Sequence, residues 1–283
     1  MKKEIFVRDK NIEFEVIQSI KTKDALFEVL QYPKLAGSSD VRAAEQLFYV
    51  GAAGMRLKLV RVTLRNGCLR NEPGTLYYMH GSDLEMKAST GGGVFKALKR
   101  RTMSGESFLV NEIHGSGQIY LEPSYGHFFL LELNNEEMIV DRSLFYAGSG
   151  DLDIGSKMVS ASAAIAGGEG LFQTRIAGTG VAVLFSHVPA EEIQKITLNN
   201  ETLSVDGSFA MMRTGGVKFT VKKSSRSWAA TSVSGEGLLQ TFSGTGSVWI
   251  APTEEIYSQL STPEGLGQLA LPPGAMYDRE TGK

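Results

Sequence analysis

The sequence is poor in the residues that carry catalysis, metal binding and covalent cross-links. It has 283 residues but only one cysteine, Cys68, and four histidines. A single cysteine excludes an intrachain disulfide framework and suits a reducing compartment. The histidines have no partners at zinc spacing, and their positions support no Ser–His–Asp or Cys–His arrangement. We therefore expect a protein that is not an enzyme and has no cofactor, with Cys68 as a small strand residue rather than a nucleophile.

An excess of one charge sign and long apolar runs are also lacking. The formal net charge is −2 and the isoelectric point is about 6.1, whereas nucleic-acid-binding domains have isoelectric points above about 9, so we expect no DNA binding. No apolar run approaches the roughly 18 residues that cross a bilayer. The N-terminus has lysines but neither the apolar region nor the cleavage site of a secretory signal. These features predict a cytoplasmic protein without a transmembrane segment.

Internal repetition is the clearest positive feature of the chain. The stretch GEGLFQTRIAGTGVAVLF at 168–185 returns as GEGLLQTFSGTGSVWI at 235–250, and a weaker copy, GESFLVNEIHGSGQIYL, lies at 105–121. The Gly-Glu pairs begin 63 and 67 residues apart. The 32 glycines have no collagen-like period, which is typical of the turns and bulges of a β-rich fold. Three copies predict three similar modules.

A second recurring unit alternates with the first. It reads TLYYM at 75–79, SLFYA at 143–147 and SFAMM at 208–212. Because the hairpin unit comes first and a Gly-Glu unit comes last, we expect the last Gly-Glu unit to complete the module that the first hairpin began. The copy at 235–250 then packs against the hairpin near 57–86, and a ring closed in this way leaves no sheet edge exposed.

Local patterns predict the strands and turns of these modules. Alternation of apolar and polar residues indicates strands at 12–20, 25–32 and 57–64. Asn66-Gly67 follows the third of these strands and is a strong hairpin signal. We interpret the G-[ST]-G motifs of the Gly-Glu copies as hairpin turns that need positive φ, because the third glycine of a dinucleotide-binding loop is missing.

Two segments depart from the β pattern. Residues 33–56 form an insertion in which helical spacing from Val41 to Val50 predicts one short helix, capped by Ser39 or Asp40. The segment 261–283 is rich in proline and glycine, which indicates an extended tail.

The predicted fold is all-β, with three similar β-sandwich-like modules in one compact body at 1–260. Their bounds are 57–103 closed by 234–257, then 104–166, then 167–233.

Three longer phrases look like the signature of one family: SGEGLLQTFSGTGSVWIAPT, DRSLFYAGSGDLDI and EPGTLYYMHGSDLEM. From about Leu57 to Tyr257 the chain resembles the altered-inheritance-of-mitochondria protein 24 family, whose bacterial members are catalogued as a domain of unknown function. The resemblance implies three repeats, each like a subunit of the tryptophan RNA-binding attenuation protein, around a pseudo-threefold axis. The family has no established enzymatic activity, and its mitochondrial members are tied to inner-membrane organisation.

Three glutamates, Glu106, Glu169 and Glu236, occupy equivalent places in the three copies. If threefold symmetry brings them to the axis, their carboxylates attract a hard cation such as calcium or magnesium. The interpretation that we favour is that each glutamate caps backbone N–H groups beside a glycine turn.

Two other groups of charged residues are candidates for binding. Asp151 and Asp153 lie two apart on an expected strand and so share one face, which suits a metal site or, as we favour, an exposed polar face. The concentrated basic run consists of Lys96, Lys99, Arg100 and Arg101. Such a run can contact RNA or an anionic membrane surface, but a solvated connector beside the triple glycine is the favoured interpretation.

These observations together predict a non-enzymatic binding or scaffold protein whose ligand the sequence does not identify; a protein partner and a homo-oligomer are both compatible with it. Two alternatives stay open. One is RNA or nucleotide binding, by analogy with the fold of the attenuation protein. The other is a metal or small-ligand site at the pseudo-threefold axis.

Overall fold

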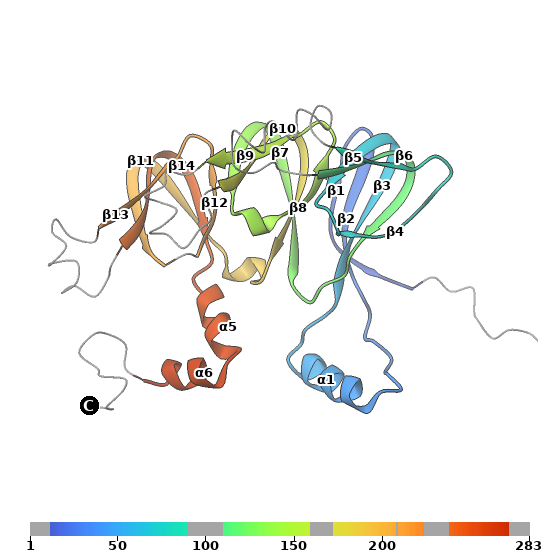
Figure 1. The fold of residues 1–283 in the computed structure, drawn as a ribbon, viewed down its shortest axis with the longest axis horizontal. Helices are drawn as coiled ribbons and strands as arrows, with labels where there is room; N and C mark the ends of the chain where they lie inside the picture. The colour runs from blue at the N-terminus through green and yellow to red at the C-terminus, as the bar shows by residue number, and fades with distance from the viewer. Residues whose placement is uncertain (1–11, 90–109, 159–171, 208, 224–237, 272–283) are drawn as a thin grey trace, which may run out of the picture.

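The protein is almost entirely β-structure, as Figure 1 shows. This computed structural model describes residues 12–89, 110–158, 172–207, 209–223 and 238–271. Fourteen antiparallel strands belong to one continuous sheet. The prediction of an all-β chain is therefore confirmed.

Twelve of the strands form three successive units, each with a long strand, two short strands and a second long strand. The first unit comprises β3 (Lys58–Asn71), β4 (Leu76–Gly81), β5 (Glu85–Ser89) and β6 (Val110–Leu121). The second comprises β7 (His127–Val140), β8 (Phe145–Ser149), β9 (Asp153–Met158) and β10 (Phe172–Ser186). The third comprises β11 (Gln194–Asp206), β12 (Ala210–Thr214), β13 (Lys218–Lys223) and β14 (Leu238–Ile250). In each unit the last strand pairs with the other three.

This pairing corrects the predicted closure between the two ends of the chain. β14 pairs with β11, β12 and β13, and no pair of described strands joins it to residues 57–103. The Gly-Glu copy that completes the first unit is instead β6, the nearest along the chain, so a shorter loop has to be closed. Short pairings of β8 with β3 and of β12 with β7 link the units, which follow one another in a row (Figure 1). This row does not confirm the predicted threefold ring.

A hairpin of β1 (Glu15–Lys21) and β2 (Ala25–Gln31) extends the first unit, in agreement with the strands predicted there. β2 pairs along the first half of β3. The side chain of Gln18 in β1 reaches the second unit, where its amide donates to the carbonyl of Phe128 (3.4 Å) and accepts from the N–H of Leu130 (3.0 Å). The hairpin therefore holds the first two units together.

Asn66-Gly67 is a β-bulge inside β3, so the predicted hairpin turn at this place is wrong. The register against β6 shifts between Leu64 and Gly67, and Asn66 has a φ of 52°. A bulge and a hairpin turn both use a residue with positive φ, which explains why the same dipeptide suits either. Asn135 in β7 and Asn200 in β11 have φ values of 55° and 58° beside equivalent register shifts.

The G-[ST]-G motifs lie within the long strands β6, β10 and β14, not in hairpin turns, so that prediction is also wrong. Their positive φ is confirmed, for example 120° at Gly115 and 154° at Gly117. A Cβ atom at Gly117 would lie 2.5 Å from the carbonyl oxygen of His80, which no real side chain permits. The motif lets the short β4–β5 hairpin cross close to β6.

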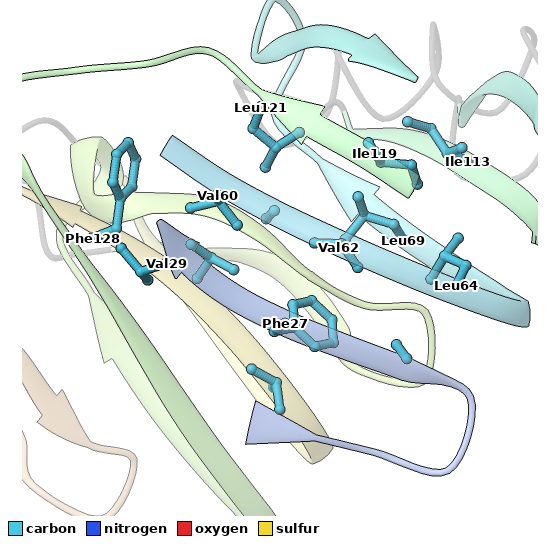
Figure 2. Close-up of a cluster of buried hydrophobic side chains, with 14 residues drawn as sticks. Phe27, Val29, Val60, Val62, Leu64, Leu69, Ile113, Ile119, Leu121 and Phe128 are labelled. Atoms are coloured by element: carbon cyan, nitrogen blue, oxygen red, sulfur yellow. The ribbon is translucent and has the colours of Figure 1, made fainter. Parts of the chain in front are cut away.

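Buried apolar side chains form cores that continue across the unit boundaries. The cluster in Figure 2 contains Phe27 and Val62 of the first unit and its hairpin. It also contains Phe128 and Val181, which belong to the second unit. A second cluster includes Met211 from the third unit. The three units are therefore packed as one body.

The helices all lie on one side of this β body (Figure 1). α1 (Val41–Ala52) confirms the predicted helix, with Asp40 as N-cap accepting from the N–H of Ala43 at 2.8 Å. α5 (Glu254–Leu260) and α6 (Pro263–Leu269) follow β14. α6 corrects the first part of the predicted extended tail, since Thr262 caps a new helix at Pro263. No described helix has the length and apolar character of a membrane span.

Candidate functional site

Two groups of predicted site residues, the repeated glutamates and the basic run, fall outside the described part of the chain. This is true of Glu106, Glu169 and Glu236, and of the basic run Lys96, Lys99, Arg100 and Arg101. Their convergence on an axis and their exposure therefore stay predictions.

A cleft of about 1770 Å³ lies on the side of the β body that carries the helices. Its roof comes from the second unit, with Phe128 and Phe185 among the lining residues. The turn after α1, including Met55, forms one wall, and Tyr257 of α5 belongs to the opposite wall. Sites for drug-sized ligands measure about 300–1,000 Å³, so this cleft has room for a larger ligand.

The two walls of the cleft carry opposite charge. Arg56 and Lys58 lie beside α1, whereas Glu191, Glu254 and Glu255 lie on the other side, on α5 and on the short 3-10 turn η2 (Ala190–Glu192). Burial lowers the pKa of Lys58 and raises the pKa of Glu254, since each loses contact with water. A bound partner with charges of both signs restores favourable interactions for both walls.

Helix α5 is fastened to the second unit's side of the cleft through one carboxylate. Glu192 of η2 accepts hydrogen bonds from the hydroxyl groups of Thr253 and Tyr257, the latter at 2.7 Å. These bonds lower the pKa of Glu192, so the carboxylate stays charged at neutral pH. The acidic wall is therefore held in place by hydrogen bonds between residues that are far apart in the sequence.

The helices beside the cleft expose large apolar side chains. α1 has no buried residue, and Phe48 is 70% exposed. The other exposed apolar residues on this side of the body are Val41, Tyr49, Met55, Ile256, Tyr257, Leu260, Leu266 and Leu269. Large apolar side chains exposed together are common at surfaces that contact other proteins or membranes.

The cleft has no nucleophile activated by a base among its described residues. The hydroxyl of Ser143 donates to Asp141 at 2.7 Å, not to a histidine. His127 also lines the cleft, and burial together with the neighbouring charge of Lys58 lowers its pKa.

A polar cluster on the first unit was not predicted. Cys68 in β3 is paired directly with His114 in β6, and Glu112 lies two residues before His114 on the same face. The Sγ of Cys68 lies 3.7 Å from Nε2 of His114, and an oxygen of Glu112 lies 3.2 Å from that same nitrogen. Glu112 and His114 lie on the same face of β6 because they are two residues apart. Cys68 lies opposite them because the bulge at Asn66 sets the register of β3 against β6.

Burial raises the pKa of the Cys68 thiol to about 11, with Glu112 adding to the effect. The thiol is thus neutral at pH 7, which agrees with the expectation that Cys68 does not act as a nucleophile.

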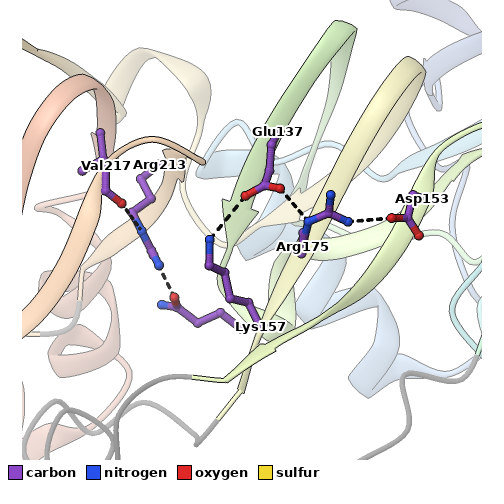
Figure 3. A network of polar contacts seen from close by, with 7 residues as sticks. Glu137, Asp153, Lys157, Arg175, Arg213 and Val217 are labelled. Carbon is purple, nitrogen blue, oxygen red and sulfur yellow. Dashed lines mark hydrogen bonds and ion pairs between the residues drawn. The ribbon is translucent and has the colours of Figure 1, made fainter.

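The two aspartates expected to share a strand face do not do so. Asp151 precedes β9 in a turn, and Asp153 begins the strand and pairs with Arg175 at 2.6 Å. Figure 3 shows that Arg175 also contacts Glu137, which in turn accepts from Lys157. Asp153 is therefore part of an ion-pair network on the second unit.

Comparison with known proteins places the chain in a family. A family model described as mitochondrial biogenesis AIM24 matches residues 52–253. The chain belongs to the AIM24 family. This match covers all three four-stranded units and ends beside α5. A search of the curated proteins found no match.

A solved structure supports the fold of this AIM24 chain. The X-ray structure of a protein from Streptococcus pyogenes is similar with a TM-score of 0.54 and 21% sequence identity. The similarity covers 73% of this chain and 94% of the streptococcal one. At this level of identity the likeness concerns the fold alone.

Proposed function

We propose that this AIM24-family chain is a non-enzymatic binding or scaffold protein whose cleft takes up an amphipathic segment of a partner protein. The observation that carries the proposal is the cleft between the turn after α1 and helix α5, about 1770 Å³ in volume, beside which both helices expose large apolar side chains. An amphipathic helix that places its apolar face in a groove is a common mode of peptide recognition.

The lining of the cleft supports a peptide ligand. The half-buried ring of Phe185 offers a large rigid contact. Met55 and Met211 also line the cleft, and methionine adapts its shape to different ligands. The opposite charges of the two walls favour a segment that is acidic near α1 and basic near α5, which fixes its direction.

The same charge distribution argues against RNA as the ligand. RNA binding depends on neutralising phosphates along a basic surface. Glu191, Glu254 and Glu255 on one wall repel phosphates, and the whole chain has a formal net charge of −2. A protein segment is therefore the better match to this cleft.

The test selects peptides from a displayed library of amphipathic sequences against the purified chain. Selected peptides are labelled, and their affinities are measured by fluorescence anisotropy for wild type, Met55→Glu and Met79→Glu. Both methionines are partly exposed, at 44% and 38%, but Met55 lines the cleft and Met79 does not. We expect binding to Met55→Glu to weaken about tenfold or more, which is a loss of at least about 1.4 kcal/mol, and binding to Met79→Glu to be unchanged.

The proposal is overturned if no peptide is enriched, or if selected peptides bind both variants equally well. Retention of mixed RNA at low salt that depends on salt concentration would replace the peptide by RNA. Turnover in a broad panel of hydrolase and oxidoreductase substrates would contradict the non-enzymatic part of the proposal.

A further inference from the structure

The cluster of Cys68, Glu112 and His114 lies on the first unit, away from the cleft. Its geometry follows from the strand register. Because the bulge at Asn66 adds one residue to β3, Cys68 becomes the direct partner of His114. A shift of the register by one residue would turn Cys68 to the other face of the sheet. The bulge therefore places a thiol, an imidazole and a carboxylate together.

The three side chains converge on one point. One ligand atom from each lies within 4.8 Å of the others, and Nε2 of His114 faces both the sulfur and the carboxylate. A catalytic triad needs a different arrangement, in which the two ring nitrogens contact the nucleophile and the carboxylate separately. Three potential ligand atoms this close together can instead share one central ion.

The surroundings hold the carboxylate in this position. Nε of Arg70 donates to the second oxygen of Glu112 at 3.1 Å, and another nitrogen of Arg70 donates to the carbonyl of Leu152. Carboxylates that bind metals are commonly oriented by such outer hydrogen bonds. The His114 side chain is 42% exposed, so an ion from solvent can reach the cluster.

We propose that Cys68, Glu112 and His114 bind a zinc-type divalent cation. Sulfur, imidazole nitrogen and carboxylate oxygen are the ligands that zinc takes in proteins, and the thiol distinguishes this site from one for calcium or magnesium. Coordination releases the thiol proton to solvent and leaves a sulfur–metal bond. Three protein ligands leave a fourth position for water or a ligand from outside. This site is independent of the cleft and of the glutamates Glu106, Glu169 and Glu236.

Cobalt(II) is a suitable probe because it takes zinc sites and reports its ligands by absorption. We expect the purified full chain to bind one cobalt ion, with a near-ultraviolet sulfur-to-cobalt charge-transfer band and intense visible bands of a tetrahedral site. Zinc should abolish these bands by displacement. Since Cys68 is the single cysteine of the chain, a thiolate-to-cobalt band can arise only from this residue.

The variants are Cys68→Ser, His114→Gln and Glu112→Gln, with His80→Gln as the matched control. His80 is an exposed histidine in the neighbouring strand β4. We expect the sulfur band to vanish in Cys68→Ser, the cobalt affinity to fall more than about tenfold in the other two, and the control to match wild type. Far-ultraviolet circular dichroism checks that each variant is folded.

Two results overturn the proposal. The first is the absence of a sulfur-to-cobalt band in folded wild type. The second is cobalt binding of equal affinity in wild type and His114→Gln, which would place the ion elsewhere. If His114→Gln does not fold, the spectrum of the wild type and the affinity of Glu112→Gln still decide the question.

Discussion

The backbone N–H of Asn66 donates a hydrogen bond to the hydroxyl of Ser116, with 2.9 Å between nitrogen and oxygen. This contact joins the bulge in β3 to the G-[ST]-G motif of β6. The equivalent pairs in the other units are Asn135 with Thr179 at 3.0 Å and Asn200 with Thr245 at 3.2 Å. An asparagine with positive φ and a hydroxyl from the facing strand are therefore one structural device used three times.

The left-handed backbone of Asn135 should make this position selective for asparagine and glycine. We expect Asn135→Ala to lower the free energy of unfolding by about 1 kcal/mol. Alanine pays about 1–2 kcal/mol in this conformation, whereas the polar side chain of asparagine offsets part of this cost by local hydrogen bonding. Asn135→Gly should stay within about 0.5 kcal/mol of wild type. Urea unfolding measures both.

The control for this prediction is Asn134→Ala, at an exposed neighbour that does not have positive φ. Equal losses in Asn134→Ala and Asn135→Ala would show that side-chain contacts, not the backbone, determine the cost.

The approach of the β4–β5 hairpin to β6 should make Gly117 intolerant of any side chain. A Cβ atom there meets the carbonyl of His80 at 2.5 Å and a methyl group of Leu84 at 2.7 Å. We expect Gly117→Ala to destabilise the protein by about 1–3 kcal/mol, as overpacking does. In Gly155→Ala the new methyl has no atom within 4 Å, so stability should be unchanged or rise by up to about 1 kcal/mol. Comparable losses in the two variants would contradict this account.

Sequence patterns predicted the local elements better than the way in which they pair. Alternation found β1, β2 and the first half of β3, and spacing with Asp40 found α1, because periodicity and caps are properties of a short segment. Asn66 was misread because positive φ serves a bulge as well as a turn. The pairing of β14 could not be read from the order of the repeats, since order leaves open which neighbouring copy completes a unit.

The candidate metal cluster shows a second limit. The sequence is enough to predict that Glu112 and His114 lie side by side, because residues two apart on a strand share a face. The position of Cys68 beside them could not be predicted, since its partner is set by a bulge whose presence changes the register by one residue. The cleft could not be predicted either, because its walls come from the turn after α1 and from α5, which lie about two hundred residues apart in the chain.

The ion-pair network around Glu137 should make stability depend on pH in the acid range. Burial opposes ionisation of Glu137, but hydrogen bonds from Arg175 and Lys157 outweigh it, so its pKa lies below the usual 4.5. A lowered folded-state pKa contributes stability above the unfolded-state value, and this contribution is lost as pH falls through the folded-state pKa. We expect Glu137→Gln to reduce stability at neutral pH and to flatten its decline below about pH 4.5.

Unfolding by urea at several pH values tests this dependence. The control is Glu132→Gln, at an exposed glutamate on the same strand. If the two variants have parallel stability curves across the acid range, Glu137 is not the group responsible.

The two hydrogen bonds that Glu192 accepts should decide how firmly α5 and α6 close the acidic side of the cleft. Removing the carboxylate in Glu192→Ala frees the hydroxyls of Thr253 and Tyr257, and α5 has no buried residue to hold it otherwise. We expect faster amide hydrogen exchange and faster proteolysis in α5 and α6, with the unfolding of the β body unchanged, because the helices open locally. Glu191→Ala, one residue away and without a described hydrogen bond to α5, should leave these rates as in wild type. Equal protection of α5 in wild type and Glu192→Ala would mean that other contacts hold the helix, and the wall of the cleft would then be rigid without this carboxylate.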